Sequence, residues 1–328
     1  MKTIQTFIPM KHSYPASENT YFLSLETTGL HPETSAIVMI GLANWDKDGL
    51  IATQYFNQTG MEQKEVLETF FKDLPSDALL ITHYGNRFAI PFLTQKAEEF
   101  GLSNPLTSIT SIDYYDIIRP WRTLFGFSSC KQKTLETFFS CYRSVSLGGK
   151  KLVKKYQSYI KHPTQETLDL LCLHNQESLK ILAELSFLRT LDDIRFGHIL
   201  PCNSKISEKS IAFSFSIDGD FPQEMSISYR DISLSLAGKN GILMLSIHPE
   251  KDSIHHYRTP IKDYYYLPVE DRVIHKSLAS FVPKEYRQRA TFDTCYEWVP
   301  SWHNALSKES DCISLIQDTI SYLLSVKL

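Results

Sequence analysis

The stretch YFLSLETTGL, residues 21–30, decides the expected fold. Its apolar half predicts a buried β-strand, and the polar residues Glu26, Thr27 and Thr28 before Gly29 predict a turn. Strand ends in α/β folds commonly meet ligands and metals, because the sheet fixes the side chain while the loop beyond leaves it accessible. Glu26 is therefore the first candidate functional residue, although a lone glutamate at a turn more often accepts hydrogen bonds from the backbone of that turn.

Strands and helices alternate in the sequence beyond this turn. Period-two and helical spacings of the apolar residues predict two more strands, then helix, strand, helix and a strand that ends at Asp113, then further helices. The expected strands cover residues 36–44, 50–56 and 78–83, and the expected helices cover residues 61–74, 87–100 and 164–188. This order predicts an α/β protein with three antiparallel strands at the start of its sheet.

Two parts of this pattern resemble motifs of one family. The string around Glu26 resembles the first motif, D-x-E-T-T-G, of the ribonuclease H-like 3′–5′ exonucleases of the DEDD type, with Ser24 at the place of the aspartate. The stretch LLITHYGNRFAIPFL, residues 79–93, resembles the box Asn-Gly-x-x-Phe-Asp-x-Pro-Phe-Leu of the YprB-like branch of these proteins. In that box Tyr84 stands at the place of the asparagine and Ala89 at the place of the aspartate.

The third motif of that family lies on a long helix, which the apolar stripe of residues 164–188 predicts. Within it LLCLHNQESLKIL, residues 170–182, resembles the segment Tyr/His-Asn-x-x-Asp, with Asn175 retained and Ser178 at the place of the aspartate. Residues three apart share a helix face, so both side chains are expected to face one site. The resemblance implies a ribonuclease H-like mixed sheet flanked by helices over residues 1–195.

The resemblance also implies a two-metal site, in which four acids hold two divalent cations. Here Glu26 is retained, while Ser24, Ala89 and Ser178 stand at the other three places. One carboxylate does not hold two Mg²⁺ ions, so we expect no metal cofactor and a catalytically degenerate site. If a site is rebuilt, Glu26 and Asp113 are the expected ligands and Mg²⁺ or Mn²⁺ the cofactor; Asp113 otherwise caps the helix that follows it.

Neighbouring side chains offer substitutes for the missing acids. Glu177 is adjacent to Ser178 but is rotated about 100° around the helix, so it is expected to point away from the site. Asp116 is another carboxylate close to the motifs. The imidazoles of His83 and His174 suit Zn²⁺ or Mn²⁺ better than Mg²⁺.

The charge of the chain is unevenly distributed. The formal net charge is −3, yet residues 117–163 contain ten basic residues and one acid. Affinity for phosphate grows with the number of charges neutralised, so this segment predicts nucleic-acid binding. Aromatic residues are interleaved with these charges and are expected either to stack on bases or to pack in the core. The expected substrate-binding residues are Thr27, Thr28, His83, Asn175, Lys150, Lys151, Lys154 and Lys155.

The region from residue 196 to residue 328 differs in pattern. Four segments between residues 210 and 247 alternate apolar and polar residues, which predicts an antiparallel sheet packed on one side. Residues 307–326 predict a final amphipathic helix. We therefore expect two domains, a ribonuclease H-like domain over residues 1–195 and a smaller β-rich module over residues 196–328.

Composition narrows the class of protein. The hydrophobic fraction of 42% supports a packed core, and no apolar run is long enough to cross a bilayer, so we expect a cytoplasmic protein without a membrane partner. The six cysteines form no C-x-x-C pair, which argues against a zinc site and a disulfide framework.

Three interpretations remain open. The favoured one is a catalytically degenerate ribonuclease H-like protein that binds nucleic acid through residues 117–163. The second is an active metal-dependent 3′–5′ exonuclease or endonuclease with a rearranged site. The third is a protein-interaction module that works through residues 196–328, and an exposed apolar patch on the predicted sheet would favour it.

Overall fold

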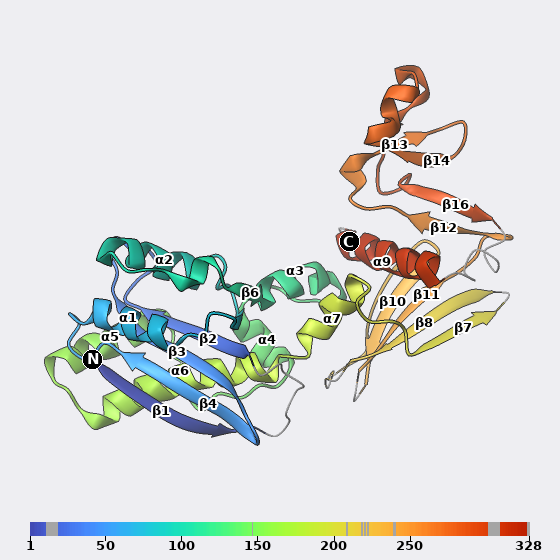
Figure 1. Ribbon diagram of the computed structural model, residues 1–328. Helices are drawn as coiled ribbons and strands as arrows, with labels where there is room; N and C mark the ends of the chain where they lie inside the picture. Colours follow the sequence, from blue (N-terminus) through green and yellow to red (C-terminus); the bar gives the residue numbers. More distant parts are fainter. Residues whose placement is uncertain are drawn as a thin grey trace. The chain divides into compact units, whose positions relative to one another are not determined.

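The structure is a computed structural model that describes residues 1–10, 19–145, 147–207, 209–217, 219, 221, 223–238, 241–300 and 309–326. It contains two compact units (Figure 1). Unit 1 consists of Met1–Asp116 and Lys131–Ser186, and unit 2 consists of Ile117–Cys130 and Phe187–Leu328. The predicted domain boundary between residues 195 and 196 stays a prediction.

Unit 1 is built on a six-stranded mixed sheet in the order β1-β4-β3-β2-β5-β6 (Figure 1). Strands β1 to β4 pair antiparallel, whereas β2, β5 and β6 run parallel to one another. Its strands are β1 (Lys2–Pro9), β2 (Thr20–Thr27), β3 (Ile37–Asp46), β4 (Gly49–Phe56), β5 (Leu79–Thr82) and β6 (Thr110–Asp113). The predicted mixed α/β sheet with flanking helices is confirmed.

Strand β1 is the main difference from the expected order of elements. Three antiparallel strands were expected and four are present, because Lys2–Pro9 pairs with β4 over its whole length. Its residues alternate between exposed and partly buried positions, as those of an edge strand do. A half-exposed edge strand buries few apolar side chains, so its sequence carries only a weak signal.

Helices cover both faces of this sheet. The helices of unit 1 are α1 (Gln63–Asp73), α2 (Ala89–Phe100), the start of α3 (Tyr114–Phe125), α4 (Gln132–Phe138), α5 (Gly149–Lys161) and α6 (Gln165–Glu184), with a short 3-10 helix at Pro105–Thr107. One core cluster joins Ile40 of β3 to α1 and α2, and a second joins Met39 to α5 and α6. Since successive strand residues point to opposite faces, these clusters lie on the two sides of the sheet.

Helix α6 lies unusually close to strand β3. The Asn175 side chain is fully buried, and a Cβ atom added to Gly41 would lie 2.1 Å from its Oδ1 atom. The same oxygen accepts a hydrogen bond of 2.9 Å from Nε2 of Gln54 on β4. Glycine at position 41 is therefore required for this approach, which fixes the rotation of α6 against the sheet. The helix ends at Glu184, four residues before the predicted limit.

The loop between β5 and α2 is held by Asp113 at the end of β6. Its Oδ1 atom accepts hydrogen bonds from the backbone N–H groups of Tyr84 at 2.6 Å and Tyr115 at 3.0 Å, and its Oδ2 atom accepts one from Asn86 at 3.0 Å. The bond from Tyr115 confirms the predicted capping role. Tyr84 adopts a positive φ of 63°, a conformation that is strained for a residue other than glycine, and its bond to Asp113 stabilises it there.

Unit 2 is rich in β-structure, as predicted for the region after residue 196. It contains an antiparallel five-stranded sheet in the order β7-β8-β11-β10-β9, a pair β12-β16 and a three-stranded sheet β14-β13-β15. The strands of the large sheet are β7 (Asn203–Ser207), β8 (Ser210–Ser216), β9 (Met225–Tyr229), β10 (Ile232–Ala237) and β11 (Ile242–Ile247). The others are β12 (Ser253–Tyr257), β13 (Tyr264–Leu267), β14 (Arg272–His275), β15 (Gln288–Arg289) and β16 (Tyr296–Pro300).

The helices of unit 2 include α7 (Leu188–Arg195) and α9 (Glu309–Ser325), and α9 packs against α7, β10 and β12. The predicted final helix corresponds to α9, and residues 307–308 of that prediction lie outside the described residues. Short 3-10 helices occupy Ile261–Asp263, Lys276–Phe281 and Lys284–Tyr286. Among the residues that the structure describes, no helix has the length and hydropathy needed to span a membrane.

The aromatic residues interleaved with the basic segment belong almost entirely to the cores. Of the eight aromatic residues between residues 117 and 163, only Tyr142 is exposed, with 83% of its surface accessible, while Phe138 and Phe139 are half-buried. The five buried ones are Trp121, Phe125, Phe127, Tyr156 and Tyr159. These five cannot stack on bases, so for them core packing is the correct one of the two expectations.

Candidate functional site

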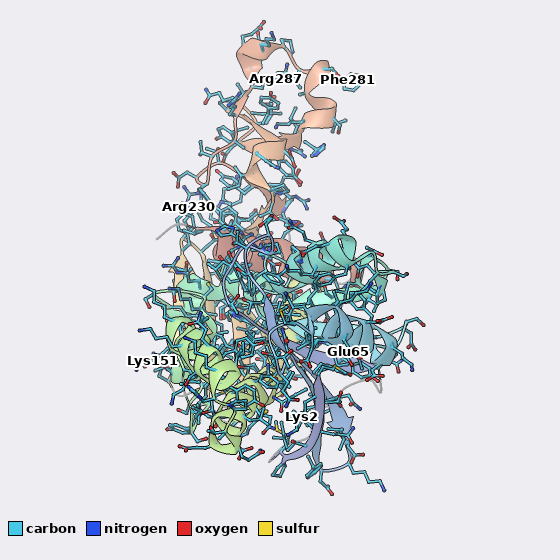
Figure 2. The ribbon with its side chains drawn as sticks, turned by 90° about the vertical axis from the view of Figure 1, so that its left-hand side faces the viewer. Lys2, Glu65, Lys151, Arg230, Phe281 and Arg287 are labelled. Carbon is cyan, nitrogen blue, oxygen red and sulfur yellow. The ribbon has the colours of Figure 1, made fainter. Side chains whose placement is uncertain are left out.

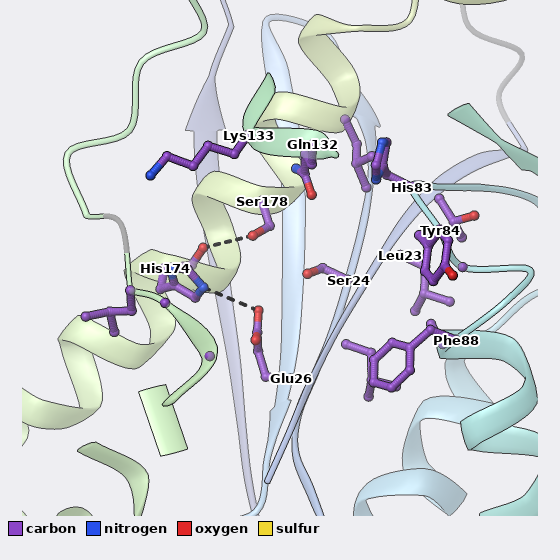
Figure 3. A pocket seen from close by; sticks show the side chains of 18 of the residues that line it. Leu23, Ser24, Glu26, His83, Tyr84, Phe88, Gln132, Lys133, His174 and Ser178 are labelled. Atoms are coloured by element: carbon purple, nitrogen blue, oxygen red, sulfur yellow. Dashed lines mark hydrogen bonds and ion pairs between the residues drawn. The ribbon is translucent and has the colours of Figure 1, made fainter. Parts of the chain in front are cut away.

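A cavity of about 760 Å³ lies at the end of strand β2 in unit 1. Ser24 and Glu26 of β2, Ala89 at the start of α2 and Ser178 of α6 all line it. Figure 3 shows Ser178 and His174 of α6 facing Ser24 and Glu26 of β2 across the pocket. The four positions that the motifs assigned to one site are thus brought together, although three of them carry no carboxylate.

The other predicted binding residues fall into two groups. His83, Lys150 and Lys151 line the same pocket. Lys154 and Lys155 are exposed on α5 but lie outside the pocket lining, and Asn175 is buried between α6 and the sheet. Figure 2 shows Lys151 on the outer side of α5.

Thr27 and Thr28 maintain the turn after β2. The hydroxyl of Thr27 donates to the carbonyl oxygen of Gly29 at 2.6 Å, and the hydroxyl oxygen of Thr28 accepts a hydrogen bond of 2.8 Å from the backbone N–H of Ala36. Neither residue lines the pocket. Asp113 does not line it either, because its carboxylate is bonded to the backbone of the loop before α2.

Arg143 is a residue of the pocket that the sequence did not single out. Its guanidinium lines the pocket, donates to the hydroxyl oxygen of Ser178 at 2.9 Å and forms an ion pair with Glu136 at 2.6 Å. The side chains of Arg143 and Glu136 are only 10% and 11% exposed. Arg143 follows α4 in a loop without regular periodicity, so the sequence marks it only as one cation among ten.

The loop that carries Arg143 is anchored to α6 by Glu177. Its Oε1 atom accepts hydrogen bonds from the backbone N–H of Ser144 at 2.6 Å and from the hydroxyl of Ser144 at 2.5 Å, and its Oε2 atom accepts one from the N–H of Val145 at 2.9 Å. The carboxylate therefore holds the loop and does not line the pocket, as its rotation around the helix predicted.

The electrostatics of Glu26 and His174 follow from burial. Burial raises the pKa of Glu26 to about 7, although the positive charge of Arg143 opposes this shift. Burial also lowers the pKa of His174, and the nearby charge of Arg143 lowers it further. The Nε2 atom of His174 lies 3.8 Å from Oε1 of Glu26. At neutral pH the imidazole is therefore uncharged, and this contact is not a full ion pair.

Comparison with known proteins identifies the family. A family model described as the RNase H superfamily matches residues 21–188, which is more than half of the chain and includes every residue of the pocket. The chain belongs to the RNase H superfamily.

Two solved proteins are similar in structure to this chain. One is the family B DNA polymerase of the hyperthermophilic archaeon Pyrobaculum calidifontis, with a TM-score of 0.41 and 11% identity, covering 60% of this chain and 29% of the polymerase. The other is a nuclease in its apo form, with a TM-score of 0.37 and 21% identity, covering 56% of this chain and 76% of the nuclease. This chain thus spans less than a third of the polymerase. No curated protein matches the sequence.

The RNase H superfamily implies divalent metal ions, and the donor set of this pocket does not fit them. Glu26 and Glu136 supply its carboxylates, and Glu136 is already paired with Arg143. A guanidinium stands 2.9 Å from the Ser178 hydroxyl, so a positive charge is present where a metal ligand would be needed. Among the described residues, no group of three or more His, Cys, Asp or Glu side chains is placed to hold a metal ion. The fold of the superfamily is therefore present, but the charges of this pocket do not fit a site for divalent metal ions.

Proposed function

We propose that this protein is a catalytically inactive member of the RNase H superfamily, of the DEDD exonuclease type and the YprB-like branch, that binds nucleic acid. The observation that carries this proposal is the contact between Arg143 and Ser178. Catalysis by two metal ions needs several converging anionic oxygens, and a fixed cation at that position repels the ions. The absence of an acid at Ser24, Ala89 and Ser178 and the presence of a buried arginine act in the same direction.

Helix α5 supports the nucleic-acid part of the proposal. Its apolar face packs against the sheet through Leu152, Tyr156 and Tyr159. The opposite side carries lysines that are all exposed, namely Lys150, Lys151, Lys154, Lys155 and Lys161. Their charges are available to phosphates, and this helix belongs wholly to unit 1, as do eight of the ten basic residues of the segment 117–163.

The binding claim is tested by the salt dependence of affinity for labelled single-stranded DNA and RNA. We expect a linear fall of log affinity with log salt, and a shallower slope when Lys150, Lys151, Lys154 and Lys155 are replaced by Gln, because each phosphate contact contributes about one unit of slope. Replacement of four exposed lysines on unit 2, Lys205, Lys209, Lys251 and Lys284, serves as the control. An unchanged slope in the α5 variant would remove the binding claim.

The claim of inactivity is tested by incubation of single strands with Mg²⁺ or Mn²⁺. We expect no cleavage above the background that the Glu26→Gln variant gives. Mn²⁺-dependent cleavage that disappears in Glu26→Gln would instead establish the second interpretation, an active nuclease with a rearranged site.

The protein-interaction interpretation has weaker support. Ile242 and Met244 are exposed on β11 of the five-stranded sheet, but their partners across the strands are Ser216 and Ser214 on one side and Ala237 and Ser235 on the other. Two apolar side chains among small and polar neighbours do not make an extended apolar patch. Nucleic-acid binding through unit 1 is the function that the described contacts favour.

A further inference from the structure

The pocket has the charge balance of an anion site. The lining contains four cations, Lys133, Arg143, Lys150 and Lys151, and the two carboxylates Glu26 and Glu136. A pocket built to hold divalent cations has the opposite balance. The excess of positive charge is concentrated on one wall, which is formed by α4, the loop with Arg143 and the first turn of α5.

The first turn of α5 adds to that wall. Gly148 and Gly149 line the pocket, and a Cβ atom added to either would meet nothing within 4 Å, so their backbone is open. No acid stands in the first turn, where Lys150 and Lys151 are found instead. Cations at a helix N-terminus are unfavourable for the helix itself, because this end already carries partial positive charge. Their position therefore strengthens a positive potential that attracts anions.

Arg143 belongs to this wall and has hydrogen-bond donors that remain available. A guanidinium has five N–H groups, and two of its nitrogen atoms are used by Ser178 and Glu136. The buried Nε2 atom of Gln132, which also lines the pocket, has no hydrogen-bond partner among the described residues. Arginine is suited to phosphate because its planar donors match two oxygens at once.

The facing wall is aromatic. Tyr84 and Phe88 line it, and Tyr84 is 45% exposed in the conformation that Asp113 stabilises. The Tyr84 ring meets the edge of Tyr115 at a centroid distance of 5.0 Å. Figure 3 shows Tyr84 and Phe88 across the pocket from Lys133 and Ser178. An accessible ring opposite a cationic wall fits a nucleotide, with its base on the ring and its phosphate on the cations.

We propose that this pocket is a metal-independent receptor for the terminal phosphate of single-stranded nucleic acid, in which the Arg143 guanidinium takes the part of a metal cation. The inference rests on the proposed function. A terminal phosphomonoester carries a charge of about −1.5 to −2 at neutral pH, whereas a diester within the strand carries a single charge, so the cationic pocket favours the end of the strand. The receptor requires no Mg²⁺, because its positive charge is supplied by side chains.

The test compares labelled oligonucleotides of one sequence that bear a 3′-phosphate, a 5′-phosphate or hydroxyl groups at both ends. Binding is measured by fluorescence anisotropy in EDTA. We expect a phosphate at one of the ends to raise affinity about tenfold or more, the effect of a strong charge-assisted hydrogen bond. Inorganic phosphate and a mononucleotide are the competitors. If inorganic phosphate competes as strongly as the mononucleotide at the same concentration, the pocket is a site for free phosphate. That result would overturn the assignment to a strand end.

Two variants separate the pocket from the general charge of α5. Arg143→Gln combined with Glu136→Gln removes both partners of the buried pair, so no charge is left unpaired, and it is expected to abolish the preference for the terminal phosphate. Lys154→Gln combined with Lys155→Gln, outside the pocket, is expected to weaken all three oligonucleotides by the same factor and to leave the preference intact. Unfolding curves of each variant establish that it is folded.

The outcomes distinguish this inference from the proposed function. Equal affinity of the wild-type protein for all three oligonucleotides, with normal salt dependence, would overturn the terminal-phosphate receptor and leave nucleic-acid binding in place. Absence of binding to any oligonucleotide would overturn both. A phosphate preference that survives in the Arg143 and Glu136 variant would place the receptor elsewhere and would also overturn the inference.

Discussion

The guanidinium of Arg143 donates to the hydroxyl oxygen of Ser178 across 2.9 Å, at the position where the resemblance to the exonuclease motif led us to expect an aspartate. The two residues lie on different elements, an irregular loop and helix α6, and are 35 positions apart in the chain. Their contact places a cation next to the one hydroxyl of α6 that faces the pocket at the expected ligand position.

Aspartates placed at the three motif positions are not expected to create a metal site while Arg143 remains. In the variant Ser24→Asp, Ala89→Asp and Ser178→Asp, the new carboxylate at position 178 pairs with the guanidinium, so Mn²⁺ binds poorly. Adding Arg143→Gln is expected to strengthen Mn²⁺ binding at least about tenfold, since the cation bonded to position 178 is removed while the carboxylate of Glu136 remains in the pocket. Titration calorimetry measures both. Equal affinity of the two variants would contradict this role of Arg143.

The ion pair between Arg143 and Glu136 is expected to contribute to stability mainly because neither charge tolerates the loss of its partner. Arg143→Leu leaves Glu136 buried and unpaired, which costs about 3 kcal/mol in the free energy of unfolding. Arg143→Leu with Glu136→Leu is expected to recover most of that loss. Urea denaturation of the two single variants and the double variant gives the coupling energy, and additive effects would show that the pair is not coupled.

The raised pKa of Glu26 makes stability depend on pH. Between its ordinary value and about 7, the native state holds a proton that the unfolded chain has released, so stability falls as pH rises through this window. Glu26→Gln is expected to abolish this fall in stability and to make the protein more stable above neutral pH. The gain is up to about 3 kcal/mol, because the Glu26 side chain is only 17% exposed and its charge is little screened by solvent. Urea midpoints across the window, compared with those of Glu33→Gln at an exposed site, provide the measurement.

Gly41 is expected to tolerate no larger residue. Gly41→Ala places a methyl group on the amide of Asn175, and relief of that overlap requires α6 to move away from β3, at a cost of about 1 to 3 kcal/mol. Asn175→Ala in the same chain removes the obstacle, so the double variant is expected to lose less than the sum of the single variants. Strict additivity in thermal or urea unfolding would show that the two side chains do not meet.

Much of unit 1 could be predicted from the sequence, because its strands and helices bury regular apolar stripes and its motifs lie at strand and helix ends. The positions Ser24, Glu26, Ala89 and Ser178 converge as the motifs required. The loop with Arg143 could not be predicted. Its conformation depends on hydrogen bonds to Glu177 and Ser178, which are distant in sequence, and such contacts leave no periodic signal.

Strand β1 was missed for a related reason. An edge strand with partly exposed residues satisfies half of its backbone groups in the sheet and buries little apolar surface, so its sequence resembles that of a polar segment. The exposed Tyr84 is a second case. Its left-handed backbone depends on the carboxylate of Asp113, which lies 29 positions further along the chain.

Glu177 and Ser178 are consecutive on α6, and together they secure the backbone and the side chain of one loop. A carboxylate introduced at position 178 would meet a guanidinium whose loop the neighbouring residue holds in place. Two adjacent positions of α6 therefore constrain each other through a loop that is distant in sequence. A substitution at position 178 that is meant to admit a cation also requires the release of the loop by Glu177.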